Sequence, residues 1–316
     1  MNNGVRLGLI GAGRWGRNYI KTIRNLEGIG LTYLASRNPK ARQWVDEDCK
    51  ITKKWKEVAD VDNIDGVIIV TPPRLHAEMT RFFLDVGLPV LVEKPLTMNL
   101  GEAETLLEFA ENKGSIVLVD HTQLFNPAWK SFKDYASGMG KVLKIESIAG
   151  NWGPFRRETP VLWDWGPHDL ALCLDIFKKV PETLDVKWVD RRNIGRDKGE
   201  IIKLSLGFGD NTQVQITIGN ILPEKKRTFT VTFEKGILVF NDLVPEKLKR
   251  FLNNQQYEEG RGEVLPFSSE SPLSCVIRTF SNRLKKHKSH LSDLRLAVQI
   301  TSILNEAQNM LRLEKP

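Results

Sequence analysis

Val5-Arg-Leu-Gly-Leu-Ile10, followed directly by Gly11-Ala-Gly13-Arg-Trp-Gly16, is the stretch of sequence that decides the fold. Its first part predicts a buried β-strand, and the GxGxxG pattern after it opens a helical stretch. Glycines in this context let a pyrophosphate approach backbone N–H groups at the N-terminus of a helix. An ordinary glycine turn is the alternative. The cofactor contacts predicted here are Gly11, Gly13, Arg14, Trp15 and Gly16.

Short apolar runs alternate with helical stretches from this turn to about residue 120. Asn99 is a predicted N-cap and Gly114 a predicted C-cap of one of the helices. Repeated βαβ units of this kind build a parallel sheet, so residues 1–121 predict a Rossmann domain that binds NAD(P). The expected strands are residues 5–10, 31–35, 66–70, 89–92 and 115–119.

Residues 122–316 follow a different pattern, with longer alternating runs such as KVLKIESIAGNW and TQVQITIG. These runs predict strands joined partly by tight turns, and apolar residues at helical spacing predict helices over 164–177 and 292–313. The basic run 283–290 lacks the aromatic residues that stack on nucleic acid, and we expect a solvated loop there. The expected fold is α/β, with a Rossmann domain followed by an α+β substrate-binding domain that has an open, mainly antiparallel sheet.

The composition excludes several classes of protein. A chain of 316 residues with 41% hydrophobic and 27% charged residues is expected to form two globular domains. Its apolar runs fall far short of the ~20 residues of a membrane helix, and its first residues do not resemble a signal peptide, so we expect a cytoplasmic protein. The three cysteines have no ligand spacing, so neither a metal site nor a disulfide is expected. The net charge of +7 favours anionic ligands without by itself indicating nucleic acid.

The end of the second predicted strand bears on the choice of cofactor. An acidic side chain at this place would bind the ribose hydroxyls of NAD. Here the residues are Ser36-Arg37-Asn38, and an arginine beside a serine can pair with the 2′-phosphate of NADP. We therefore predict contacts from Ser36 and Arg37 to NADP, with NAD as the alternative cofactor and a surface arginine as the alternative for Arg37.

Two later strand ends are expected at the same edge of the sheet, where open α/β sheets bind their ligands. Thr71-Pro72 is predicted to border the nicotinamide ribose, and His76 is a candidate contact or else a structural cap or surface histidine. Glu93-Lys94-Pro95 ends the next strand, which points the lysine into the crevice beside the nicotinamide, and Glu93 and Lys94 are predicted cofactor contacts.

Asp164 and His168 are four residues apart in LWDWGPHDLALCLDIF. This spacing puts both side chains on one helical face, provided that the helix includes both. Pro167 leaves the start of that helix open.

GAGRWG, EKP and WDWGPHD, in this order, resemble the Gfo/Idh/MocA family, named for glucose-fructose oxidoreductase and inositol dehydrogenase. The resemblance covers nearly the whole chain. It implies an NAD(P)-dependent oxidoreductase that transfers a hydride between nicotinamide and a secondary alcohol or ketone of a sugar, cyclitol or sugar nucleotide. It also implies that Lys94, Asp164 and His168 are catalytic, and that the open sheet forms homodimers or homotetramers.

Each of the three implied catalytic residues is assigned a role. A histidine has an ordinary pKa near ~6.5, so His168 can accept the alcohol proton at neutral pH. Asp164 would orient the imidazole, and Lys94 would stabilise developing alkoxide charge. Lysine as the base remains an alternative, as do a plain helix residue for His168 and a helix cap for Asp164.

Two further segments supply candidates for ligand contacts. His121-Thr-Gln-Leu-Phe-Asn-Pro127 resembles the family's segment crossing between domains, where Gln123 would face the nicotinamide and Asn126 the substrate; linker packing is equally open. Asn151-Trp-Gly-Pro-Phe-Arg-Arg157 combines arginines with aromatic residues, which suits a sugar ring with an acidic group, such as a uronate or a sugar nucleotide. Arg156 is therefore a substrate candidate, with a structural aromatic cluster and solvated arginines as the alternative. Trp165, in WDWGPHD, is a further substrate candidate.

Two other functions compete with this interpretation. A non-catalytic NAD(P)-binding sensor or regulator can retain the fold, and a reductase of a non-sugar substrate can share it. The presence of Lys94, Asp164 and His168 together favours the carbohydrate oxidoreductase.

Overall fold

The computed structural model describes residues 4–59, 64–156, 158–209, 212–252, 258 and 261–313. The chain forms two compact units, residues 1–122 with 271–301 and residues 123–270 with 302–316. The last helix, α7 (Ser292–Leu313), contributes residues to both units. Within the described part of the chain, no helix combines the length and the apolar character needed to cross a membrane.

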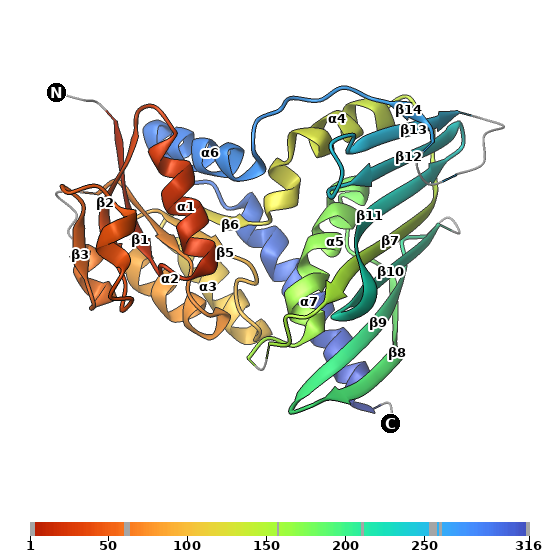
Figure 1. The fold of residues 1–316 in the computed structure, drawn as a ribbon, viewed down its shortest axis with the longest axis horizontal. Coiled ribbons are helices and arrows are strands. Elements are labelled where there is room, and N and C mark those ends of the chain that lie inside the picture. Colours follow the sequence, from red (N-terminus) through yellow and green to blue (C-terminus); the bar gives the residue numbers. More distant parts are fainter. Residues whose placement is uncertain are drawn as a thin grey trace. The chain divides into compact units, whose positions relative to one another are not determined.

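The first unit is built on a parallel sheet with strand order β3-β2-β1-β4-β5-β6 (Figure 1). The order reverses between β1 and β4, and ligands of open α/β sheets bind outside the strand ends at such a point. This order confirms the predicted Rossmann domain. The strands are β1 (Val5–Ile10), β2 (Ile29–Ala35), β3 (Lys50–Thr52), β4 (Gly66–Ile69), β5 (Val90–Glu93) and β6 (Val117–Asp120).

Helices cover both faces of this sheet (Figure 1). Helix α1 packs against α6, and α2 packs against α3. The helices are α1 (Arg14–Arg24), α2 (His76–Asp85), α3 (Leu100–Asn112) and α6 (Pro272–Lys286), with the short 3-10 turns η1 (Ala41–Trp44), η2 (Trp55–Ala59), η3 (Pro73–Leu75) and η4 (Thr122–Phe125). The predicted N-cap of α3 is confirmed, because Oδ1 of Asn99 accepts a hydrogen bond from the Glu102 N–H at 3.0 Å. The C-cap is Lys113, and the predicted Gly114 follows it with a φ of +60°.

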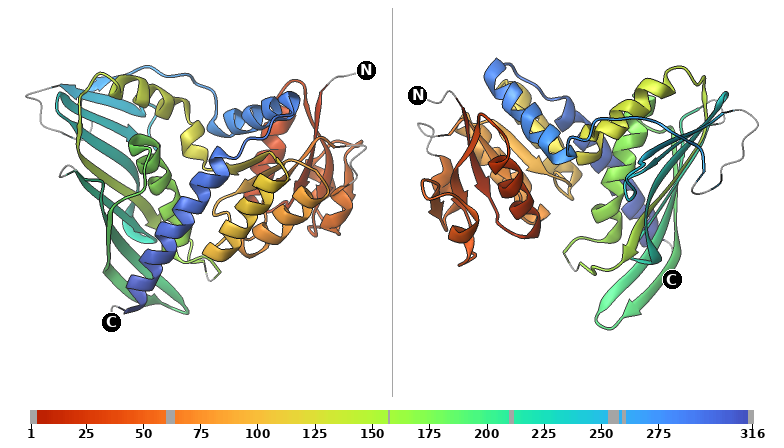
Figure 2. Two further views of the ribbon diagram at one scale, coloured as in Figure 1. Left: turned by 180° about the vertical axis from the view of Figure 1, so that it is seen from behind. Right: turned by 45° about the horizontal axis from the view of Figure 1, so that its top comes forward.

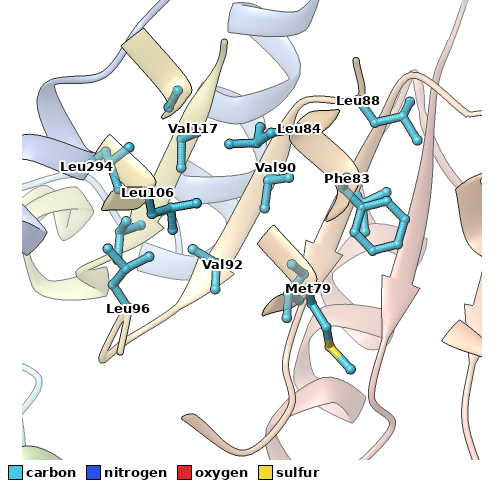
Figure 3. Close-up of a cluster of buried hydrophobic side chains, with 14 of the residues drawn as sticks. Met79, Phe83, Leu84, Leu88, Val90, Val92, Leu96, Leu106, Val117 and Leu294 are labelled. Carbon is cyan, nitrogen blue, oxygen red and sulfur yellow. The ribbon is translucent and has the colours of Figure 1, made fainter. Parts of the chain in front are cut away.

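Buried aliphatic and aromatic side chains fill the space between β4, β5, β6 and the helices α2 and α3. Every residue of those three strands is buried, as expected for a sheet covered on both faces. Figure 3 shows this core, in which Leu294 of α7 joins Phe83, Val90 and Leu106. The start of the last helix is therefore part of the core of the first unit.

The expectation of a loop over residues 283–290 is wrong for its first half. Helix α6 continues to Lys286, and His287 ends it with a left-handed φ of 48°. The reason is that Phe280 and Leu284 bury the apolar face of the helix, while Arg283, Lys285 and Lys286 complement the negative end of its dipole.

The second unit is an eight-stranded sheet with order β14-β13-β12-β11-β7-β10-β9-β8. All neighbouring strands are antiparallel except β7 and β10, so the mainly antiparallel sheet is confirmed. Helix α5 lies against one face of it (Figure 2). The strands are β7 (Val142–Trp152), β8 (Thr183–Ile194), β9 (Asp197–Gly207), β10 (Gln213–Gly219), β11 (Ile221–Phe233), β12 (Gly236–Asn241), β13 (Leu248–Leu252) and β14 (Glu263–Val264).

Two further helices belong to the second unit, α4 (Pro127–Ala136) and α5 (Val161–Phe177). Helix α5 begins three residues earlier than predicted and runs through Pro167. The helix therefore includes both Asp164 and His168, which puts the two residues on one helical face.

Candidate active site

The glycine turn after β1 has three positions with different steric requirements. Gly11 has a φ of +99°, and a Cβ there would lie 2.3 Å from the carbonyl oxygen of Val70. A Cβ at Gly16 would lie 2.0 Å from the carbonyl oxygen of Gly11, so this glycine lets α1 pack closely on the turn. A Cβ at Gly13 would meet nothing within 4 Å. Gly13 therefore leaves an open approach to the helix.

The N-terminus of α1 can bind an anion. Its N-cap, Gly13, makes no side-chain capping bond, and the first turn contains no acidic residue. Gly13, Arg14 and Trp15 are exposed there. The first N–H groups of a helix point outward and carry a partial positive charge, so this end fits the pyrophosphate of a dinucleotide.

Trp15 and Glu93, both predicted cofactor contacts, bond to each other. The indole N–H of Trp15 donates to Oε1 of Glu93, and the hydroxyl of Tyr19 lies 3.1 Å from the same oxygen. The backbone N–H of Lys94 donates to Oε2 of Glu93 at 3.2 Å. Glu93 thus ties α1 to the end of β5, and it fixes the backbone from which the half-buried Lys94 side chain leaves.

Asp120 lies opposite Glu93 in the register of β5 and β6. Its Oδ2 accepts a hydrogen bond from the Tyr19 hydroxyl, and its Oδ1 accepts one from Thr122 at 2.8 Å. Burial raises the pKa of the Asp120 carboxyl, and burial with the neighbouring Asp120 charge raises that of Glu93 well above its usual range. The two buried carboxyls therefore hold protons more tightly than exposed acids do.

His76 is 1% exposed, so the alternative of a surface histidine is wrong. One ring nitrogen lies 2.8 Å from the carbonyl oxygen of Pro95 and the other 2.7 Å from that of Thr71. Burial lowers the pKa of the imidazole. His76 thereby joins the loop after β4, where Thr71 is half-buried and Pro72 exposed, to the loop after β5.

Ser36 and Arg37 follow the last residue of β2, at the edge of the sheet that carries the glycine turn. The backbone N–H of Ser36 donates to the Thr52 carbonyl at 2.9 Å, and the Ser36 hydroxyl accepts a hydrogen bond from the Asn38 N–H at 3.1 Å. Arg37 is exposed. This arrangement holds the serine in place and leaves the guanidinium open to a ligand.

In the second unit, Asp164 forms an ion pair with Arg156, with 3.0 Å between Oδ2 and Nε. The arginine that the sequence suggested for an acidic substrate group is therefore bound to a candidate catalytic carboxylate. Arg157, the other arginine of that segment, lies outside the described residues.

A small pocket opens in the second unit beside α5. Trp165 and His168, predicted from the sequence, line it, and so do three charged residues that the sequence did not suggest: Asp169, Arg227 and Asp242. The missed residues lie far apart in the chain, on α5, on β11 and after β12, and no motif links them. Apolar side chains complete the wall: Ala149, Leu172, Phe229 and Phe240.

Gln123 and Asn126 point their amide groups at Asp242. Nε2 of Gln123 donates to Oδ2 of Asp242 at 2.9 Å, and Nδ2 of Asn126 donates to Oδ1 at 3.1 Å. Lys247 pairs with Oδ1 at 2.7 Å. Both amides are buried, and only Gln123 is also part of the pocket wall. Among the described residues, no cluster of His, Cys, Asp or Glu side chains could hold a metal ion.

Comparison with known proteins gives a family-model match over residues 5–121, to GFO_IDH_MocA, described as an oxidoreductase family with an NAD-binding Rossmann fold. The chain is also similar to a solved structure from Magnetospirillum magnetotacticum described as an oxidoreductase, with 37% identity and a TM-score of 0.89. That likeness covers 95% of this chain and 98% of the other.

Two curated relatives are similar over different lengths. UDP-N-acetylglucosamine 3-dehydrogenase from Acidithiobacillus ferrooxidans is 21% identical over 92% of this chain and 91% of its own length. 4-Carboxy-2-hydroxymuconate-6-semialdehyde dehydrogenase from Sphingobium sp. is 31% identical over 39% of this chain, and the match covers 40% of that enzyme.

Proposed function

Because this chain belongs to the Gfo/Idh/MocA family of oxidoreductases, we propose that it moves a hydride between NAD(P) and a secondary alcohol or ketone of a sugar, cyclitol or sugar nucleotide. The observation that carries the proposal is the glycine turn, whose Gly13 leaves an uncapped helix N-terminus open to a pyrophosphate. The relative that acts on UDP-N-acetylglucosamine supports the substrate class.

The proposed chemistry gives each catalytic residue one task. The bound nicotinamide supplies the hydride acceptor or donor. In the oxidation direction His168 takes the alcohol proton as the carbon loses its hydride, and Asp164 stabilises the charged imidazole from one turn earlier on α5. The ammonium group of Lys94 stabilises charge that develops on the substrate oxygen. Trp165 offers an aromatic face to the sugar ring from the pocket wall.

Most of the cofactor contacts proposed here lie at the carboxyl edge of the first sheet, where backbone groups of the glycine turn hold the pyrophosphate and Thr71 and Pro72 border the nicotinamide ribose. Gln123, which belongs to the second unit, is proposed to contact the nicotinamide. The position of Arg37 after β2 supports NADP over NAD, because a guanidinium can bind the 2′-phosphate in bidentate fashion. A kinetic comparison of NADPH with NADH tests this preference, and faster turnover with NADH would contradict it.

Turnover with a substrate panel tests the proposed function itself. Purified protein is mixed with NADP or NAD and with sugars, cyclitols and UDP-sugars, and absorbance of the reduced nicotinamide is followed. Loss of turnover by about 10²–10⁴-fold in His168→Ala and Lys94→Ala, with cofactor affinity retained in His168→Ala, is the expected result. Cofactor binding without turnover on any substrate would favour an NAD(P)-binding sensor instead.

We also propose that the protein is a cytoplasmic homodimer or homotetramer. Cys49 and Cys173 are buried as thiols, which suits a reducing compartment. Strand β7 exposes Ile148 and Trp152, and a second copy of the chain would bury such apolar groups. Light scattering of the purified protein gives the oligomeric state, and a monomer at micromolar concentration would contradict this part of the proposal.

A further inference from the structure

Arg227 lies in the pocket wall together with Trp165 and Asp169. Its guanidinium carbon is 4.9 Å from the centroid of the Trp165 ring, a cation–π contact. The charge of Arg227 lowers the pKa of the Asp169 carboxyl, against the larger effect of burial, but in the described part of the chain the two side chains form no ion pair. The N–H groups of the guanidinium therefore keep their capacity to donate to a ligand.

Asp169 offers the pocket an acceptor that the protein does not use. Its Oδ1 accepts a hydrogen bond from the Ser147 hydroxyl at 2.6 Å, whereas its Oδ2 has no hydrogen-bond partner among the described residues. The residue is 6% exposed, and burial raises the pKa of its carboxyl to about 6. A buried polar atom without a partner is costly, so the unused oxygen indicates a place for a ligand hydroxyl.

The remaining carboxylate of the pocket, Asp242, already has bonding partners. It is bound by the ammonium group of Lys247 and by two amides. Outside the pocket, Arg156 is paired with Asp164. Arg227 is thus the basic side chain of the pocket wall, and in the described residues its charge is opposed by Asp169 without an ion pair between the two.

We propose that a sugar derivative binds at the mouth of this small pocket through an acidic group, a carboxylate or a phosphate, which binds the N–H groups of Arg227 while a neighbouring hydroxyl donates to Oδ2 of Asp169. The inference rests on the proposed function, because it narrows the substrate class of the same site. A planar guanidinium held by an aromatic ring suits bidentate binding of an oxyanion. The net charge of +7 favours the approach of such a ligand.

Direct binding measurements test the proposal without relying on turnover. Calorimetric titrations compare a set of hexuronates and a set of hexose phosphates with their neutral parent sugars, in the presence of NADP. The expected result is that at least one acidic sugar binds about tenfold or more tightly than its neutral parent, since charge-assisted bonds contribute about 1.5–3 kcal/mol. Preference for uronates or for phosphates identifies the acidic group.

Substitutions at the pocket are matched with one outside it. Arg227→Gln should remove the preference for the acidic sugar. Arg227→Lys should retain part of it, because lysine keeps the positive charge but lacks the paired N–H donors of a guanidinium. Arg192→Gln is the control, since Arg192 also lies over a tryptophan, Trp152, at 5.9 Å but does not line the pocket. Asp169→Asn should weaken binding of the acidic sugar and of its neutral parent by similar factors.

Two results would overturn the inference: no acidic sugar binding better than its parent, or wild-type preference in both Arg227 variants with an intact melting temperature. Failure of the proposed function can be distinguished from failure of this inference. If acidic sugars bind in an Arg227-dependent manner while nicotinamide is never reduced or oxidised, the ligand assignment stands and the oxidoreductase assignment fails.

Discussion

Two groups of buried polar side chains, one in each unit, are satisfied in different ways. In the first unit, the four oxygens of Glu93 and Asp120 all accept hydrogen bonds from protein groups, although Oγ1 of Thr80 and Nδ1 of His121 have no partner in the described residues. In the second unit, Oδ2 of Asp169 has no hydrogen-bond partner in the described residues, and Arg227 lowers the pKa of that carboxyl without forming an ion pair with it. The difference teaches that the Glu93–Asp120 network is complete in the protein alone, whereas in our proposal a ligand completes the pocket.

The largest effect on stability is expected from breaking the closed network, by which we mean the hydrogen bonds among Tyr19, Glu93, Asp120 and Thr122. Asp120→Ala removes the acceptor of the half-buried Thr122 hydroxyl and leaves the buried Tyr19 hydroxyl with Glu93 alone, and it should lower the free energy of unfolding by about 2–3 kcal/mol. Urea denaturation followed by tryptophan fluorescence measures this loss. A variant as stable as wild type would show that the network does not support the fold.

The pH dependence of stability tests the pocket of the second unit, through the buried carboxyl of Asp169. The folded protein raises the pKa of Asp169 to about 6 from an ordinary 3.8, so the folded state binds this proton more tightly than the unfolded state. Protonated Asp169 therefore contributes fully to the free energy of unfolding below about pH 4, and this contribution is lost as the pH rises through about 6. Asp169→Asn should reduce the fall in melting temperature between pH 4 and pH 6, and an unchanged fall would contradict the assignment.

A smaller effect is expected from removing one hydroxyl of the closed network. Tyr19→Phe keeps the ring packing but takes away the group that bridges Glu93 and Asp120, which should cost about 1 kcal/mol. Phe132→Tyr is the control: it adds a hydroxyl in the buried core of the second unit, so it shows how a one-oxygen change outside the network affects stability. Differential scanning calorimetry of both variants makes the comparison.

The smallest change in stability, within about 0.5 kcal/mol, is expected from Gly13→Ala, because a Cβ at this position meets no atom within 4 Å. The added methyl group would instead stand in the approach to the helix N-terminus, so affinity for NADP should fall about tenfold or more. Quenching of tryptophan fluorescence on cofactor titration measures the affinity. Unchanged affinity for NADP would show that the pyrophosphate does not bind next to Gly13.

Local patterns in the sequence predicted much of the fold. The bounds of β1 and of α7 agree with the structure, because an apolar run before a glycine turn and a long helical periodicity are decided by neighbouring residues. The motif residues Trp15, Glu93 and Asp164 were found in the same way. Their actual partners, Tyr19 with Asp120 and Arg156, were not predicted, since side chains of different elements meet only in the folded chain.

The pocket residues Asp169, Arg227 and Asp242 show the same limit. Arg227 begins the alternating part of β11 and carries no local sign of function. Its position over Trp165 arises from the pairing of β11 with β7 and from the packing of α5 on the sheet. Such residues become visible only when strands far apart in sequence are assembled.

The assignment of residues 271–301 to the first unit limits how this protein can be divided or recombined. A fragment that stopped at residue 121 would lack Leu294 and Ala297, which close the core around Leu106 and Val117. Exchange of cofactor domains between relatives at a single crossover would therefore produce an incomplete core. In a working chimera the parent that supplies the glycine turn would also have to supply α6 and the beginning of α7. The N-terminal segment and residues 271–301 would therefore have to come from the same parent.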